Sequence, residues 1–197
     1  MKKGIFMAVL MVGAFCTSVS AASDVPDDAL TVIHSRKSVR HFTGRSVDAD
    51  TLTRIVRAGM AAPAAENMQA RSFVIVTAKE GLEALAAGLP YAKMLDQAGA
   101  AIVVCALPEK AYQKKAEFAI LNATCASENM LLAIEALKLG GVWTAVYPEE
   151  NLMAHVRDTL GIPENVIPLN VIPVGEPTGV DRPKDKFNPE NMHWEKW

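Results

Sequence analysis

Cysteine is scarce in this sequence, and its positions fit neither a disulfide scaffold nor a metal site. Cys16, Cys105 and Cys125 are the three cysteines among 197 residues, and their spacing excludes a disulfide framework and a cysteine-based metal site. The four histidines also lack metal-ligand spacing and a paired acid, so we expect structural or surface roles for them: His34, His41, His155 and His193. We therefore predict that the chain holds no metal.

Repeats, strong net charge and long apolar runs are missing as well. No internal repeat or low-complexity tract occurs, and beyond the N-terminus no segment reaches the roughly 18 uninterrupted apolar residues of a membrane helix. The formal net charge is −2, whereas general nucleic-acid binding needs a basic face. We expect neither nucleic-acid binding nor stable insertion into a membrane.

The N-terminus has the pattern of a secretory signal. Lys2 and Lys3 precede an apolar core at residues 5–15, which is too short to span a bilayer, and small residues continue to Ala22. The pattern predicts a signal peptide over residues 1–22, with cleavage after Ala21 or Ala22. The protein would then be periplasmic or secreted, with residues 23–197 forming a single domain.

Two alternatives remain open for this part of the chain. Cys16 offers a lipoprotein interpretation, although the bulky Phe15 before it fits a lipobox poorly.

Removal of residues 1–21 would leave 18 basic and 22 acidic residues, a net charge of −4. In the mature chain we expect Cys105 and Cys125 to be buried free thiols, with a single disulfide as the alternative in an oxidising compartment.

Helical and strand patterns alternate along the rest of the chain. Helices are expected over residues 26–34, 48–61, 79–89, 112–139 and 151–160, and strands over residues 73–77, 101–105, 142–147 and 166–174. The last strand contains Pro168 and Pro173, so we expect it to be an edge strand or an irregular one. The longest helix is apolar nearly all round, which is typical of the centre of a domain or of a dimer interface.

The C-terminal segment is polar but ends with two tryptophans. Residues 178–197 show little apolar periodicity, yet Trp194 and Trp197 stand close to the end. Large aromatic residues usually anchor against another surface. We interpret this segment as an arm that wraps around a partner subunit.

Two basic clusters lie far apart in the sequence and could converge on one phosphate. Residues 36–40 read Arg-Lys-Ser-Val-Arg, and residues 184–186 read Lys-Asp-Lys. Arginine and lysine both suit a dianionic phosphate monoester. Taken alone, such clusters are more often solvated surface.

Four segments in order give the chain a family resemblance. They are the cluster at residues 36–40, the Ala-Pro-Ala-Ala-Glu-Asn-Met-Gln stretch at 62–69, the Leu-Gly-Gly-Val-Trp stretch at 139–143, and Val-Gly-Glu-Pro at 174–177 followed by the second basic cluster. In this order and spacing the chain resembles the FMN-dependent nitroreductase family from about residue 30 to its end. The resemblance implies an α+β fold, with a central, mostly antiparallel sheet flanked by helices. It also implies an interlocked homodimer that has a C-terminal arm and two FMN sites at its interface.

The resemblance also assigns residues to the flavin. Arg36, Lys37, Ser38 and Arg40 would hold the FMN phosphate and ribityl chain, and Lys184 and Lys186 would bind the same phosphate. Pro63, Ala64, Ala65 and Asn67 would approach the flavin from the other subunit, with Gln69 beside them, and the backbone at Thr144 and Ala145 would face the flavin N5 side. No catalytic side chain is expected, because the flavin carries its own chemistry.

The implied activity is the transfer of reducing equivalents from NAD(P)H, through FMN, to a nitroaromatic, quinone or related small-molecule acceptor by a ping-pong mechanism. The chain departs from the family pattern at Ala64, where serine is common, and at Ala70-Arg71, where Pro-Trp is common. The same scaffold could instead reduce an enone, a halogenated aromatic compound or free flavin. A further alternative is an exported flavin-binding protein with little turnover.

Overall fold

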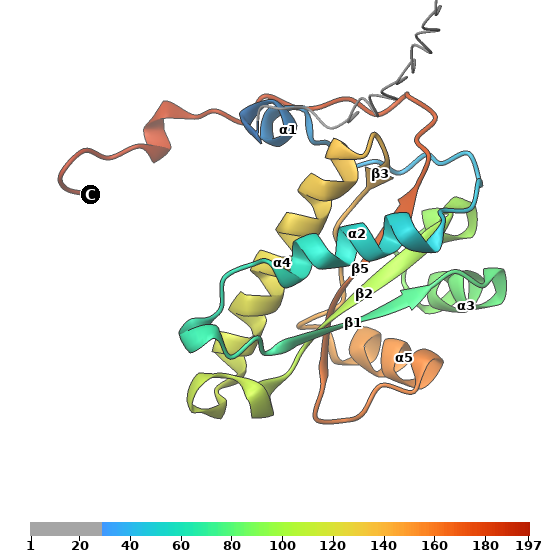
Figure 1. The fold of residues 1–197 in the computed structure, drawn as a ribbon, viewed down its shortest axis with the longest axis horizontal. Coiled ribbons are helices and arrows are strands. Elements are labelled where there is room, and N and C mark those ends of the chain that lie inside the picture. Colours follow the sequence, from blue (N-terminus) through green and yellow to red (C-terminus); the bar gives the residue numbers. More distant parts are fainter. Residues whose placement is uncertain (1–28) are drawn as a thin grey trace, which may run out of the picture.

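The computed structural model describes residues 29–197 (Figure 1). The expected signal peptide and the beginning of the first expected helix lie outside these residues. Among the described residues, no helix has the length and apolar character needed to cross a membrane.

A five-stranded sheet forms the centre of the structure, and all of its strand pairs are antiparallel. The strands are β1 (Arg71–Val76), β2 (Ala100–Ala106), β3 (Gly140–Gly141), β4 (Thr144–Ala145) and β5 (Ile167–Gly175). Their order is β1-β2-β5-β3, and β4 also pairs with β5. Two short strands therefore replace the single strand expected over residues 142–147.

β5 lies in the middle of the sheet, so the expectation of an edge strand was wrong, whereas the expected irregularity is present. Pro168 lies where the pairing with β2 shifts register, between Val104 and Cys105 of the partner strand. Pro173 lies between the residues of β5 that pair with β4 and those that pair with β3. Both prolines thus occupy interruptions of the ladder, where a missing backbone N–H is tolerated.

In the described part of the chain, five α-helices surround the sheet: α1 (Ala29–Ser35), α2 (Ala49–Met60), α3 (Lys79–Gly88), α4 (Ala116–Ala136) and α5 (Glu150–Leu160). Short 3-10 turns lie between helices and strands at Ala65–Asn67, Lys93–Gln97, Pro108–Lys110 and Tyr112–Lys114, and a further one lies after β5 at Pro189–Asn191. The long helix begins later than expected. The backbone at Gln113 and Lys114 has φ angles of 54° and 53°, which interrupt a right-handed helix.

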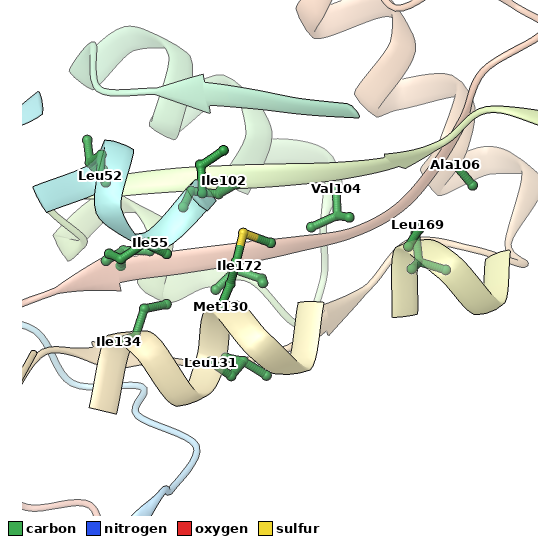
Figure 2. Close-up of a cluster of buried hydrophobic side chains, with 14 of the residues drawn as sticks. Leu52, Ile55, Ile102, Val104, Ala106, Met130, Leu131, Ile134, Leu169 and Ile172 are labelled. Atoms are coloured by element: carbon green, nitrogen blue, oxygen red, sulfur yellow. The ribbon is translucent and has the colours of Figure 1, made fainter. Parts of the chain in front are cut away.

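The helices cover the two faces of the sheet as separate layers. Alternate residues of β2 point to opposite faces: Ile102 and Val104 pack with α2 and α4, whereas Val103 and Cys105 pack with α3 and α5. Figure 2 shows the first layer, in which Met130 and Ile134 of α4 face the sheet. Burial of each such side chain contributes about 1.5–3 kcal/mol, so α4 is anchored along its length.

One side of α4 and the C-terminal tail are exposed to solvent. Leu121 on α4 is 60% exposed, and Cys125 one turn later is exposed as well, so the expectation that Cys125 is buried was wrong. Cys105 is buried, and both thiols are free. The C-terminal tail (residues 182–197) is exposed throughout and extends away from the sheet beyond α1 (Figure 1).

Candidate functional site

The basic segment (residues 36–40) is held against the sheet by its one buried residue. Val39 is buried, and its backbone N–H donates a hydrogen bond of 3.0 Å to the carbonyl oxygen of Gly141. A Cβ atom at Gly140 would lie only 2.6 Å from Cγ1 of Val39. Glycine at this position therefore allows the basic segment to lie directly on β3.

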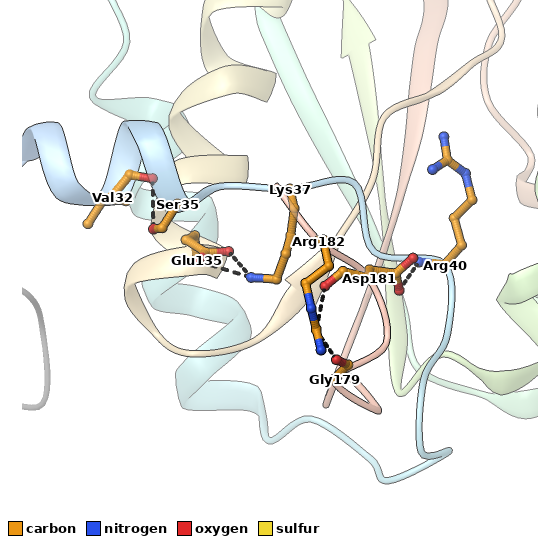
Figure 3. A network of polar contacts seen from close by, with 8 residues as sticks. All are labelled: Val32, Ser35, Lys37, Arg40, Glu135, Gly179, Asp181 and Arg182. Atoms are coloured by element: carbon orange, nitrogen blue, oxygen red, sulfur yellow. Dashed lines mark hydrogen bonds and ion pairs between the residues drawn. The ribbon is translucent and has the colours of Figure 1, made fainter. Parts of the chain in front are cut away.

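Helix α4 pairs with the first two cations of the basic segment. Nζ of Lys37 lies 3.1 Å from both carboxylate oxygens of Glu135, and Nε of Arg36 lies 3.5 Å from Oε1 of Glu128. Figure 3 shows the contact between Lys37 and Glu135. The Lys37 ammonium is thereby engaged within the chain, whereas Arg36 keeps a longer contact with a more exposed carboxylate.

Asp181 joins the basic segment to the chain that follows β5. One of its carboxylate oxygens accepts a hydrogen bond of 3.1 Å from the backbone N–H of Arg40 (Figure 3). Nδ1 of His41 lies 3.2 Å from both oxygens. Burial raises the pKa of Asp181, but the hydrogen bonds from Arg40 and His41 and the charge of His41 outweigh it, and the pKa is lowered overall. An isolated bridge between Phe42 and Pro177 continues the same junction.

This junction brings the two basic clusters to one groove. The groove has a volume of about 540 Å³ and is lined by residues of α1, the basic segment and the tail: Ile33, His34, Arg36, Pro183, Lys184, Asp185, Lys186 and Phe187. Arg36, Lys184 and Lys186 thus share one concave surface. Three cations in one groove fit the phosphate end of FMN, because each supplies charge-assisted donors. Ser38 and Arg40 follow Arg36 closely in sequence, and both are exposed, but they do not line the groove.

The loop of residues 63–69 (the 63–69 loop) has an unusual backbone. Glu66, Asn67 and Gln69 have φ angles of 48°, 56° and 51°, a region that non-glycine residues adopt at a cost of about 1–3 kcal/mol each. Nε2 of Gln69 donates a hydrogen bond of 3.2 Å to Oδ1 of Asn67. Both side chains are exposed and are free to meet a ligand or another chain.

Arg71 and Asn122 lie beneath this loop, and sequence reasoning did not assign a role to either. Arg71 is 8% exposed and donates hydrogen bonds to Oδ1 of Asn122 (2.8 Å) and to the carbonyl oxygens of Met60 and Ala62. Nδ2 of Asn122 donates to the carbonyl oxygen of Pro63 (2.7 Å). Burial lowers the pKa of the Arg71 guanidinium, while Cys125 nearby acts in the opposite direction. The sequence did contain one indication of a special role for Arg71, because the family pattern commonly has tryptophan at this position.

Within the single chain, the cavity beside the 63–69 loop is separate from the basic groove. A mostly apolar cavity of about 250 Å³ lies between the loop and the first half of α4, lined by Pro63, Ala64, Ala65, Phe118, Leu121, Asn122 and Cys125. The basic segment instead contacts the second half of α4, through Glu128 and Glu135. Residues that the family resemblance brings to one flavin therefore lie at different ends of α4.

β4 places its two residues differently. Thr144 is buried and its Oγ1 donates to the carbonyl oxygen of Val171 in β5, whereas Ala145 is exposed. Both residues line a small cavity with Tyr91, whose side chain is 83% exposed. Within residues 29–197, no cluster of His, Cys, Asp and Glu side chains could hold a metal ion.

Comparison with known proteins identifies the family. The sequence model of the nitroreductase family matches residues 33–89 and 84–176. The chain belongs to the nitroreductase family. A nitroreductase-family protein of Archaeoglobus fulgidus is 36% identical over 174 residues, which cover 87% of this chain and 99% of that protein. A crystal structure from Parabacteroides distasonis has 41% identity and a TM-score of 0.82, and the match covers 87% of this chain and 100% of that one. Both carry the name "Putative NADH dehydrogenase/NAD(P)H nitroreductase".

Two less similar proteins carry names that include FMN. A Bacillus subtilis protein named "FMN reductase (NADPH)" is 24% identical over 188 residues, covering 86% of this chain and 74% of its own length. The structure of an "FMN-dependent Nitroreductase" from Clostridium difficile has a TM-score of 0.78 at 21% identity, and the match covers 85% of this chain and 99% of that one. The likeness to the second protein concerns the fold, which confirms the expected α+β nitroreductase architecture.

Proposed function

We propose that this nitroreductase-family protein is an FMN-dependent oxidoreductase that takes reducing equivalents from NAD(P)H and passes them to a nitroaromatic, quinone or related acceptor. The observation that carries the proposal is the groove that gathers Arg36, Lys184 and Lys186. The three cations come from two segments far apart in the sequence, and their one printed ion pair is the 3.5 Å contact of Arg36 with the half-exposed Glu128. A phosphate monoester would satisfy them.

Several groups of this chain would hold the cofactor. Arg36, Lys184 and Lys186 would bind its phosphate, and the neighbouring Ser38 and Arg40 would contact the phosphate or the ribityl chain. The ammonium of Lys37 is already engaged by Glu135, so Lys37 would mainly attach the basic segment to α4 and not bind the phosphate directly. The exposed Ala145 of β4 and the exposed side chains of the 63–69 loop would face the ring.

The proposal includes a homodimer. The basic groove and the 63–69 loop lie at different ends of α4, so one ring would be reached by the groove of one subunit and the loop of its partner. The exposed Leu121 on α4 and the exposed aromatic residues Trp194 and Trp197 of the tail supply apolar surface for such an interface.

When bound, FMN would supply the hydride chemistry of the reaction. The protein would bind and orient the cofactor, and its cations and N–H groups would stabilise negative charge on it. One binding place would serve donor and acceptor in turn, which gives ping-pong kinetics. We assign no side chain as a catalytic acid or base.

The direct test uses purified protein. It should be yellow, and NAD(P)H added without oxygen should bleach it. The double substitution Arg36→Ala with Lys184→Ala should abolish FMN retention while the protein stays folded, because it removes charge-assisted bonds of about 1.5–3 kcal/mol each. A wild-type protein that stays colourless and cannot be reconstituted with FMN would refute the proposal, as would wild-type FMN affinity in the double variant.

We further propose that the protein is exported, on the strength of the signal pattern at residues 1–22. That pattern favours one alternative function, a flavin-binding protein with little turnover, because nicotinamide donors are scarce outside the cytoplasm. Fractionation of tagged protein between periplasm and cytoplasm tests export. Yellow periplasmic protein that an artificial donor reduces, and NAD(P)H does not, would favour the alternative.

A further inference from the structure

We infer that Arg71 and Asn122 form a clamp that positions the 63–69 loop for the cofactor, which makes Arg71 a positioning residue. The inference rests on the proposed flavin function of the loop. The clamp itself is a property of the single chain, so it can be tested without the cofactor.

The first support is the arrangement of the hydrogen bonds. The Arg71 guanidinium donates to the carbonyl oxygens of Met60 and Ala62, where α2 ends and the chain turns into the loop. It also donates to Asn122 of α4, and Asn122 donates in turn to the carbonyl oxygen of Pro63. The planar fork of arginine thus joins two backbone positions just before the loop to Asn122, and Asn122 holds a third position, Pro63, where the loop begins.

The second support is the charge. Arg71 is 8% exposed, and no carboxylate within residues 29–197 forms an ion pair with it. Its Nε also has no hydrogen-bond partner among the described residues. A protein with a well-packed apolar side chain in such a place is usually no less stable than one with a buried charge. The arginine therefore has a purpose other than core stability, and its bonds point to the loop.

The third support is the conformation of the loop. The three positive φ angles at Glu66, Asn67 and Gln69 persist where the surroundings fix the backbone. The side chains of these residues are exposed. Hydrogen bonds of 3.0 Å inside the loop, from the N–H of Asn67 to Ala64 and from the N–H of Met68 to Ala65, are therefore supplemented by contacts at its two ends. Asn122 holds the first end at Pro63, and at the second end the backbone N–H of Arg71 donates to the carbonyl oxygen of Gln69 (2.7 Å). The side chain of Arg71 thus acts at the first end of the loop, whereas its backbone holds the second.

Two substitutions and one control test the clamp. Arg71→Lys keeps the positive charge and loses the fork, and Asn122→Ala removes the link to Pro63. Asn129→Ala is the matched control, since Asn129 lies on the same helix and donates to a carbonyl oxygen of α2, that of Ala58, away from the loop. The readouts are the FMN dissociation constant of each apoprotein by fluorescence, its melting temperature, and amide hydrogen exchange at residues 64–69 without FMN.

We expect Arg71→Lys and Asn122→Ala to weaken FMN binding about tenfold or more, the effect of one charge-assisted hydrogen bond, and to speed exchange at residues 64–69. Asn129→Ala should change neither the FMN affinity nor the exchange at residues 64–69, even if it lowers the melting temperature as much as the two clamp variants do. Wild-type FMN affinity and wild-type exchange in both clamp variants would overturn the inference, and so would an equal loss of affinity in Asn129→Ala. If wild-type apoprotein binds no FMN, the proposed function fails, and the exchange data alone decide on the clamp.

Discussion

Neighbouring cations of the basic segment have different partners, although they look equivalent in sequence. Arg36 lines the groove with Lys184 and Lys186. Lys37 points to Glu135, and these side chains are only 23% and 14% exposed. Solvent screens such a pair less than a surface pair, so Lys37 contributes more to the attachment of the basic segment to α4 than to the groove.

Substitution of these two residues should therefore have opposite consequences. Lys37→Met should lower the free energy of unfolding by about 1–2 kcal/mol, between the effects of a surface and a buried pair, and leave FMN affinity nearly unchanged. Arg36→Met should weaken FMN binding with little change in stability. Denaturant unfolding and fluorescence titration measure the two effects, and a larger loss of FMN affinity in Lys37→Met than in Arg36→Met would contradict this division.

The two cysteines of the described chain should differ in reactivity. Burial raises the pKa of the Cys105 thiol to about 12, so almost no thiolate forms near neutral pH. In native protein at pH 8 we expect iodoacetamide to leave Cys105 unmodified, whereas both Cys105 and Cys125 should react in denaturant. Mass spectrometry of the labelled peptides checks this, and labelling of Cys105 at equal rates in both conditions would show that it is accessible.

At the scale of elements, the close approach of β3 to the basic segment depends on a missing side chain. A methyl group at Gly140 would collide with Cγ1 and Cβ of Val39, at 2.6 and 2.8 Å. Val39 is stiff and buried, so it cannot move aside. The basic segment would have to shift instead, and Arg36 would shift with it.

Gly140→Ala should accordingly lower the free energy of unfolding by about 1–3 kcal/mol and weaken FMN binding. Gly59→Ala in α2 is the control for a crowded methyl group away from the basic segment. Its Cβ would lie 2.8 Å from Cγ of Met130 and 3.3 Å from the carbonyl oxygen of Ala126, and a gain in helix propensity of about 1 kcal/mol offsets part of that cost, so it should lower stability without weakening FMN binding. Thermal unfolding compares the two variants. A Gly140→Ala variant with wild-type stability and wild-type FMN affinity would show that Val39 accommodates the added methyl group.

The helices and most strands could be predicted because local signals and burial agree. Asp48 begins α2 as expected, and its carboxylate accepts a hydrogen bond of 2.8 Å from the N–H of Thr51. The central place of β5 could not be predicted, since prolines are tolerated there through a register shift and a gap between two partner strands. Such interruptions arise from tertiary pairing, which leaves no local pattern.

The candidate site could be predicted in part for the same reason. The order of motifs indicated that Arg36, Lys184 and Lys186 belong together, and the structure places them at one groove. Their role toward FMN stays a prediction. The positive φ angles of the 63–69 loop and the burial of Arg71 were not predictable, because an arginine in a sequence is normally expected at the surface.

At the scale of the whole molecule, the tail adds nothing to the core of the single chain. Residues 182–197 are exposed, with Trp194 at 80% and Trp197 at 101% of their full accessible surface. Aromatic side chains of this size dominate the energetics of interfaces. The tail is therefore the part of the chain whose contribution depends most on a second copy.

Deletion of residues 188–197 should leave the helical content measured by circular dichroism unchanged and weaken the proposed dimer. The double substitution Trp194→Ala with Trp197→Ala should do the same, because few residues carry most of the energy of an interface. Sedimentation velocity over a range of protein concentrations measures the association. A truncated chain that stays dimeric at the same concentrations as the full chain would exclude the tail from the interface.

The central position of β5 has a consequence for how the chain acquires its structure during synthesis. β5 joins β2 to β3 and β4, yet it is the last strand of the described chain to leave the ribosome. Before residues 167–175 emerge, the two parts of the sheet have no common partner, and the pairing of β2 with β5 links residues far apart in sequence, which slows folding. The domain should therefore fold after translation has nearly finished, and a chain that ends before residue 167 should not fold at all.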